Sequence, residues 1–194
     1  ILTFAGDANG DVPPRRAIFG PHTQMKNPQA LGIDYLHGEI FVPQEDSVLV
    51  FPRDANGDVA PIRVLQGPDT GLRPQRLTLD PVHDLLIVSG NKGIRIFDRK
   101  ANGNTKPLRT ITGSPAAGTV IMTTYPPKGM IVAAVHDGGG GEFGGGEGGG
   151  GADLSSRFAA QDYIGVWSVF DDGPAPPRFM VGGPNNVYKD IRGV

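Results

Sequence analysis

The side chains with the clearest metal-binding pattern belong to a five-residue motif, Asp-Ala-Asn-Gly-Asp, that occurs twice. Oxygen donors alternate along each copy, as Asp7, Asn9 and Asp11 and as Asp54, Asn56 and Asp58. Such alternation is typical of the start of a calcium-binding loop. Neither copy has the glycine that such a loop needs at its sixth position, and the third copy, residues 100–104, begins with lysine. We therefore expect a tight turn at each copy, with calcium binding as the alternative.

Histidine is the other candidate metal ligand, and the chain has four, at positions 22, 37, 83 and 136. A structural zinc site needs several converging ligands, and the spacing of these residues does not indicate convergence. His37 and His83 occupy equivalent places, three residues after Asp34 and Asp80. We expect both histidines to project toward solvent from surface turns.

His136 and Asp137 stand at the start of a glycine-rich tract and form the first pair to consider for a ligand site. Residues 138–151 read GGGGEFGGGEGGGG, with Phe143 as the one aromatic side chain. This composition offers too little apolar surface to offset the entropy of ordering, so we expect a mobile loop. The alternative is a ligand-binding loop in which Phe143 is an anchor beside His136 and Asp137.

Catalysis has no support in the motifs of this chain. It contains no G-x-S-x-G elbow, no H-E-x-x-H sequence and no cysteine nucleophile. Its net charge of −2 gives no basic field for nucleic acid. The longest strongly apolar stretch, residues 130–135, is far shorter than the roughly 20 residues that span a bilayer. We expect no nucleic-acid partner and no membrane insertion.

A segment repeated about every 46 residues must position these side chains. Its four copies begin at Ile1, Val48, Ile94 and Trp167, and each contains an aromatic anchor and a later P-x-R-x-x-x-G motif. The anchors are assigned to Phe4, Phe51, Phe97 and Phe170. The arginines are Arg16, Arg63, Arg109 and Arg178. A side chain that recurs at one place in every copy indicates a structural role, so we expect each arginine to pair with a carboxylate on a neighbouring strand.

Each repeat has the pattern of four short strands. In one copy, alternation and β-branched residues predict strands over 31–35, 39–42, 48–51 and 63–65. The 30 glycines and 18 prolines supply the turns, and Asn-Gly falls between the third and fourth strands. A four-stranded unit repeated every forty-odd residues is typical of a β-propeller blade. We predict an all-β propeller of about four blades, as one domain over residues 1–194, with a glycine-rich insertion at about 136–160.

The stretch NPQALGIDYLHGEIFVPQEDSVLVF, residues 27–51, and its copy RPQRLTLDPVHDLLIVSGNKGIRIF, residues 73–97, resemble the NHL-type repeat of bacterial propellers. The resemblance implies the propeller fold. It leaves the function open, since such propellers serve in adhesion and protein binding and in occasional hydrolase chemistry.

In the frame of that family, the chain begins on the third strand of one blade and ends within the first strand of another. We expect part of a ring of about six to eight blades, or a four-bladed ring that lacks one or two strands. Either arrangement leaves strand edges unpaired, and an open edge is a template for a strand from another chain.

These observations favour a noncatalytic binding or scaffold propeller that joins protein partners, or further copies of itself, through its open blade edges or its loop face. Gly-, Asn-, Thr- and Pro-rich turns, the lack of cysteine and a family that is commonly exported favour an extracellular or periplasmic location. The alternative is a metal-dependent hydrolase of the gluconolactonase-like propeller type, with one ion held on the central axis.

Overall fold

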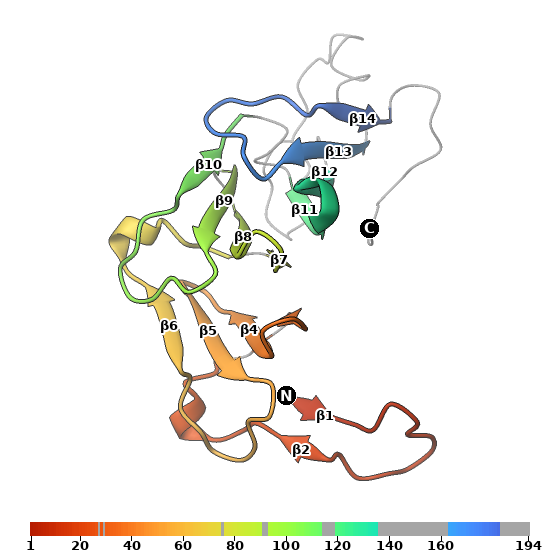
Figure 1. The fold of residues 1–194 in the computed structure, drawn as a ribbon. Coiled ribbons are helices and arrows are strands. Elements are labelled where there is room, and N and C mark those ends of the chain that lie inside the picture. Colours follow the sequence, from red (N-terminus) through yellow and green to blue (C-terminus); the bar gives the residue numbers. More distant parts are fainter. Residues whose placement is uncertain are drawn as a thin grey trace, which may run out of the picture. The chain divides into compact units, whose positions relative to one another are not determined.

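The computed structural model describes residues 1–26, 28, 30–74, 76–90, 93–113, 119–135 and 163–182. This part of the chain is all-β and has the four-stranded blades of a β-propeller. Three four-stranded antiparallel sheets and one two-stranded sheet are built from strands that are consecutive in the chain (Figure 1). The chain forms two compact units, described separately below. No helical segment among the described residues has the length and apolar character to cross a bilayer.

The first unit comprises Ile1–Pro74 and Lys100–Lys106. It contains a two-stranded sheet and the first blade, which pairs its four strands in chain order. The two-stranded sheet is β1 (Leu2–Thr3) and β2 (Arg16–Ala17); the blade is β3 (Gly32–Asp34), β4 (Glu39–Pro43), β5 (Ser47–Pro52) and β6 (Arg63–Gln66). The four predicted strands of this blade are confirmed to within one residue at each end. Strands β4 and β5 are buried almost throughout, which accounts for their β-branched and aromatic composition.

The second unit comprises Gln75–Arg99 and Pro107–Val194. Its second blade is β7 (Arg76–Asp80), β8 (Leu85–Gly90), β9 (Gly93–Asp98) and β10 (Arg109–Ile111). Its third blade is β11 (Thr119–Tyr125), β12 (Met130–Val135), β13 (Tyr163–Ser168) and β14 (Phe179–Val181). The first strands of these blades are linked by a 2.5 Å hydrogen bond from the Thr124 hydroxyl to the Leu79 carbonyl.

Three short 3₁₀ turns begin at prolines that follow the strands. They are η1 (Pro21–Thr23), η2 (Pro68–Thr70) and η3 (Pro126–Lys128). The first two follow the last strand of a sheet, β2 and β6, whereas η3 connects β11 to β12. Each of these turns ends on a residue in the left-handed region, Gln24, Gly71 or Gly129.

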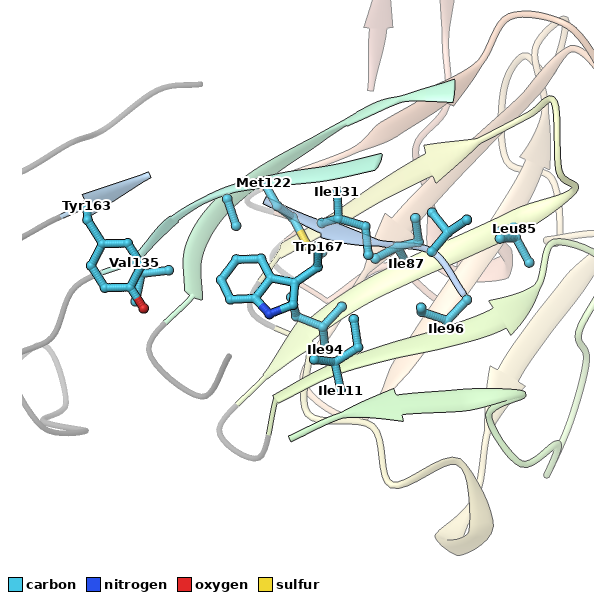
Figure 2. Close-up of a cluster of buried hydrophobic side chains, with 12 residues drawn as sticks. Leu85, Ile87, Ile94, Ile96, Ile111, Met122, Ile131, Val135, Tyr163 and Trp167 are labelled. Atoms are coloured by element: carbon cyan, nitrogen blue, oxygen red, sulfur yellow. The ribbon is translucent and has the colours of Figure 1, made fainter. Parts of the chain in front are cut away.

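The aromatic anchor of the third blade is Trp167, and its assignment to Phe170 was wrong. Trp167 pairs with Ile131 and is fully buried, whereas the Phe170 side chain is 59% exposed. Figure 2 shows the indole beside Ile94 and Ile111 in the core of the second unit. Its Nε1–H donates to the Ala175 carbonyl at 3.1 Å, so the one polar atom of the ring is satisfied.

Candidate interaction site at the blade edges

The Asn-Gly motif lies against the outer strand of the preceding sheet. In the first unit, the Ala17 amide donates to Oδ1 of Asn56 at 2.9 Å. The Gly57 amide donates to the Ala17 carbonyl at 2.7 Å, and the Phe19 amide donates to the Gly57 carbonyl at 3.2 Å. We call this three-bond arrangement the edge clasp. The glycine has the expected positive φ, but the motif joins two sheets in addition to turning the chain between its own strands.

The same edge clasp covers the outer strand of the first blade, β6. The Val64 amide donates to Oδ1 of Asn102 at 3.0 Å. The Gly103 amide donates to the Val64 carbonyl at 2.7 Å, and the Gln66 amide donates to the Gly103 carbonyl at 3.1 Å. The loop that follows β9 therefore belongs to the first unit, although β9 itself belongs to the second.

A third edge clasp covers β10 within the second unit. The Thr110 amide donates to Oδ1 of Asp172 at 2.8 Å, so that a carboxylate takes the place of the asparagine amide. The Gly173 amide donates to the Thr110 carbonyl at 2.9 Å, and the Thr112 amide donates to the Gly173 carbonyl at 2.7 Å. Asn-Gly and Asp-Gly thus perform one role at three successive junctions.

The residue after the clasp glycine adds a flanking contact at the first two junctions. Asp58 accepts from the His22 amide at 2.8 Å, and its other oxygen lies 2.7 Å from Nδ1 of His22. At the next junction, Asn104 accepts from the Asp69 amide at 2.7 Å. The glycine of the P-x-R-x-x-x-G motif makes room for this contact, since a Cβ there would collide with the side chain of Asp58 or Asn104; these glycines are Gly20 and Gly67.

The predicted calcium ligands are not gathered into one site. Asn56 and Asp58 are engaged by the preceding sheet, as described above, and Asp54 is exposed. The other three, Asp7, Asn9 and Asp11, are exposed as well. No group of three or more His, Asp or Glu side chains that could hold a metal occurs in the part of the chain that the structure describes.

The first copy of the motif has the conformation of an edge clasp, and no bond from it to an outer strand occurs within the described part of the chain. Gly10 has φ 77°, close to the 79° of Gly57. The Ala8 amide donates to the Ala5 carbonyl at 3.1 Å, and the equivalent bond in the first blade has the same length. Among the described residues, neither the Asn9 side chain nor the Gly10 amide has a hydrogen-bond partner. The hairpin between β1 and β2 therefore presents a preformed clasp.

Strand β14 is an outer strand on which no clasp lies among the described residues. Its pairing register aligns it with β10: Phe179 pairs with Val166 as Arg109 pairs with Ile96, so Val181 is equivalent to Ile111. Val181 is 54% exposed, whereas Ile18, Leu65 and Ile111 are at most 2% exposed. Its neighbours Phe179 and Met180 are 61% and 59% exposed. By equivalence with β10, the Met180 amide and carbonyl and the Gly182 amide point away from β13, and none of them has a partner within the described ranges.

The repeated arginines bind different groups. Arg63 makes two bonds to the Glu39 carboxylate, at 2.9 and 2.8 Å, and Arg178 makes bonds of 2.5 and 3.2 Å to Asp171. The expected pairing with a carboxylate on another strand is confirmed at Arg63, whereas Arg178 pairs with a carboxylate of the loop between β13 and β14. At Arg109 it is wrong, because the Nε–H donates to the Val169 carbonyl at 2.9 Å. The guanidinium of Arg109 also lies 5.6 Å from the centre of the exposed Phe170 ring. Nε of Arg16 is buried without a partner among the described residues.

The pKa of Asp171 is lowered in the folded chain. The hydrogen bonds from Arg178 have the largest effect on this pKa, and the charge of the guanidinium acts in the same direction. The Ser168 amide also donates to the carboxylate, at 2.8 Å, while partial burial acts in the opposite sense. An ion pair therefore anchors the exposed strand β14 to the loop after β13.

The two Asp-x-x-His turns are rigid structural elements. Asp34 is fully buried and accepts from the Leu36 and His37 amides, at 3.0 and 2.9 Å. Nδ1 of His37 lies 2.8 Å from its second oxygen, and Asp80 and His83 repeat this 2.8 Å contact. The histidine side chains are about 30% exposed rather than projecting freely into solvent. In each turn the aspartate side chain accepts hydrogen bonds from the backbone amides two and three residues later, which explains why the Asp-x-x-His pair recurs.

The ligand pair His136 and Asp137 and the anchor Phe143 fall outside the described residues. The site that the structure defines is the set of sheet edges, formed chiefly by backbone atoms. Comparison with protein-family models and with curated proteins gives no match for this chain.

Proposed function

We propose that this chain is a noncatalytic binding or scaffold module of the NHL-type propeller kind, located outside the cytoplasm. It associates with protein through the uncovered outer strand β14. The observation that carries the proposal is the exposure of β14, where Val181 is 54% exposed at a position that is buried on three other outer strands.

An uncovered strand edge offers both chemical features that protein association requires. Its free amides and carbonyls can form main-chain hydrogen bonds with an added segment, and its apolar side chains provide apolar surface that the partner buries. In β14, three consecutive side chains, Phe179, Met180 and Val181, are all more than half exposed.

The use of the described polar groups supports the noncatalytic part of the proposal. The buried carboxylates of Asp34 and Asp80 are taken up by turn amides and by their histidines. Glu39 binds Arg63. These carboxylates are already bound to structural partners, whereas a catalytic acid or base must be accessible to a substrate.

Sedimentation velocity across a wide concentration range tests the proposal. The parent chain is expected to self-associate weakly, and Met180→Lys is expected to leave it monomeric because a charge enters the edge. Leu108→Lys is the matched control, since Leu108 is also 54% exposed but lies outside β14. A parent chain that stays monomeric throughout, or a Met180→Lys chain that associates as the parent does, overturns the proposal.

A further inference from the structure

We infer that Arg109 and Phe170 form a binding site for a carboxylate that carries a neighbouring apolar group, such as an acidic side chain beside an aromatic one in a peptide. The site goes beyond the proposed function, because neither residue lies in β14. Its basis is that Arg109 occupies the position of Arg63 in its blade, but no carboxylate stands where Arg63 has one.

Arg109 and Arg63 are equivalent residues of two blades. Each is the first residue of its fourth strand and pairs with the third strand at the corresponding place. The carboxylate partner of Arg63 is Glu39, which pairs with the last residue of the first strand. The residue with the same pairing in the second blade is Leu85, a member of the buried apolar cluster in Figure 2. The second blade therefore repeats the cation and has a hydrocarbon side chain in place of the anion.

The Arg109 side chain is held in place through only one of its three nitrogens. Its Nε–H donates to the Val169 carbonyl at 2.9 Å. Nη1 and Nη2 have no hydrogen-bond partner among the described residues, and they are not among the buried unpaired atoms of that part of the chain, so they are accessible to solvent. In Arg63, the same two nitrogens bind both oxygens of Glu39, at 2.9 and 2.8 Å. The edge of the guanidinium that binds a carboxylate in the first blade is thus open in the second.

The acidic side chains of the surrounding loops are bound elsewhere. These loops belong wholly to the described residues and comprise residues 81–84, 126–129 and 169–178. Their carboxylates bind another guanidinium or a strand amide; they are Asp84, Asp171 and Asp172. An added carboxylate would therefore meet a guanidinium that is already fixed in place, which reduces the entropy lost on binding.

Phe170 provides the apolar side of the site. The centre of its ring lies 5.6 Å from the guanidinium carbon of Arg109, and the His83 ring meets it edge-on with 5.5 Å between centroids. A Cβ at Gly129 would lie 3.2 Å from the ring, so the turn before β12 also packs closely against it. These contacts position the ring although Phe170 is 59% exposed.

The fold does not require an aromatic side chain at this position. Phe170 stands three residues after the anchor Trp167, and the residues three places after the anchors of the first and second blades are Asp54 and Lys100. Both of these are exposed. An aromatic ring kept at the surface beside an arginine with open donors is typical of sites that bind a partner.

A carboxylate with an adjacent apolar group uses both features of the site. The planar guanidinium binds the two oxygens of a carboxylate through parallel hydrogen bonds, as Arg63 binds Glu39. The face of Phe170 offers apolar surface to the group that carries the carboxylate. A small acid that makes only these contacts is expected to bind weakly, with a Kd of roughly 1–10 mM.

NMR titration of the full chain with 3-phenylpropionate tests the inference. The resonances of Phe170 and the Nε–H of Arg109 are expected to shift in a saturable manner. The neutral amide of the same acid keeps the ring and lacks the charge, so it is expected to cause no saturable shift at the same concentrations. Equal binding of the acid and the amide would show that the charge plays no part, and the inference would fall.

Arg109→Gln should weaken binding of 3-phenylpropionate about tenfold or more, because both charged hydrogen bonds are lost. Arg53→Gln is the matched control, since it removes the same charge from an exposed position outside the site and should bind as the parent chain does. Phe170 resonances report binding in both variants, and circular dichroism shows that the blades are folded. An Arg109→Gln chain with the affinity of the parent overturns the inference.

Leu85→Glu tests the equivalence of the two blades directly. It gives the second blade the ion pair of the first, so Arg109 should be occupied within the chain and binding of 3-phenylpropionate should be lost. Leu85→Gln is the matched control, because it places a polar group of the same size there without the charge and should leave binding in place. A folded Leu85→Glu chain that binds as the parent does contradicts the inference, and Arg109→Gln decides the matter if either Leu85 variant does not fold.

Three further probes identify the source of the carboxylate. The blocked dipeptide acetyl-Glu-Phe-amide carries it as a side chain, and acetyl-Gln-Phe-amide is its neutral control. Binding of the glutamate peptide supports a segment of a protein partner, whereas binding of 3-phenylpropionate alone supports a small organic acid. Inorganic phosphate is expected to cause no saturable shift. If phosphate binds as tightly as 3-phenylpropionate, or if neither 3-phenylpropionate nor the glutamate peptide binds, the inference is overturned.

Discussion

The Ala17 amide donates a 2.9 Å hydrogen bond to the side chain of Asn56, a residue 39 positions further along the chain. The same relationship joins Val64 to Asn102 over 38 positions, at 3.0 Å. A dipeptide that usually serves a local turn thus binds an outer strand that is remote in sequence. The stability of each junction should therefore respond to changes in a loop that is remote in sequence.

Asn56→Ala should lower the free energy of unfolding of the first unit by about 0.5–1.5 kcal/mol, because the Ala17 amide loses its partner. Urea unfolding followed by circular dichroism measures the change. Asn9→Ala is the control, because the Asn9 side chain has no partner among the described residues, and it should leave stability unchanged. Equal losses for both variants would contradict the assignment of Asn56 to the clasp.

Gly57→Ala should destabilise the first unit by roughly 1–2 kcal/mol through its backbone alone. Gly57 has φ 79° and its Cβ position is in open space, so the cost arises from the left-handed conformation and not from a collision. Gly6→Ala adds the same methyl group in open space without a positive φ. Thermal unfolding of the two variants should show the loss for Gly57→Ala alone.

Trp167→Ala should cost about 3–5 kcal/mol, because it empties a fully buried position and removes the bond to Ala175. Phe170→Ala should cost about 1 kcal/mol or less, because the ring is largely exposed and makes one edge contact with His83 and one cation–π contact with Arg109. The comparison by denaturant unfolding identifies the true anchor of the third blade. A larger loss of stability for Phe170→Ala than for Trp167→Ala would show that Phe170 is the anchor, as the sequence predicts.

Arg178→Gln should raise the pKa of Asp171 toward its ordinary value, which NMR titration of the carboxyl carbon can follow. The pKa is lowered in the folded chain, so the ion pair stabilises the fold at pH values above about 3.9, the ordinary aspartate value. That contribution is lost as the pH falls through the lowered pKa of Asp171. Between pH 5 and pH 2, the free energy of unfolding should therefore fall less for Arg178→Gln than for the parent chain. An Asp171 titration that does not change in the variant would contradict the pairing.

The strands of the first blade could be predicted closely because their signal is local. Runs of β-branched and aromatic residues, buried almost throughout, define β4 and β5 independently of the rest of the chain. Aspartate followed three residues later by histidine marks the turn between β3 and β4. The clasps could not be predicted in the same way. Asn56 and Asn102 have their partners on the preceding sheet, and a hairpin turn accounts for the same dipeptide without any distant contact. The repeated glycine of the P-x-R-x-x-x-G motif was the available sign, because a glycine on an outer strand indicates the close approach of another segment.

The misassigned anchor has a different cause. The loop of the third blade has the usual length, but its arginine stands one place earlier, because Phe179 pairs with Val166 as Arg109 pairs with Ile96. Trp167 therefore stands 11 residues before Arg178, whereas Phe97 stands 12 before Arg109. The Val-Phe pair at 169–170 imitates the pattern of the other copies. Burial resolves the ambiguity: Tyr163, Gly165 and Trp167 share one face of β13, and Gly165 leaves the space that the indole fills.

The edge clasp also sets an order in which the protein can be completed on the ribosome. Each outer strand emerges before the loop that covers it, by 39, 38 and 62 residues at the three successive junctions. At elongation rates of roughly 5–20 residues per second, β10 waits the longest, since residues 136–162 must be translated before Asp172 appears. During that interval a nascent chain exposes an outer strand without its clasp, and neighbouring nascent chains on one messenger RNA would be the first to meet that edge.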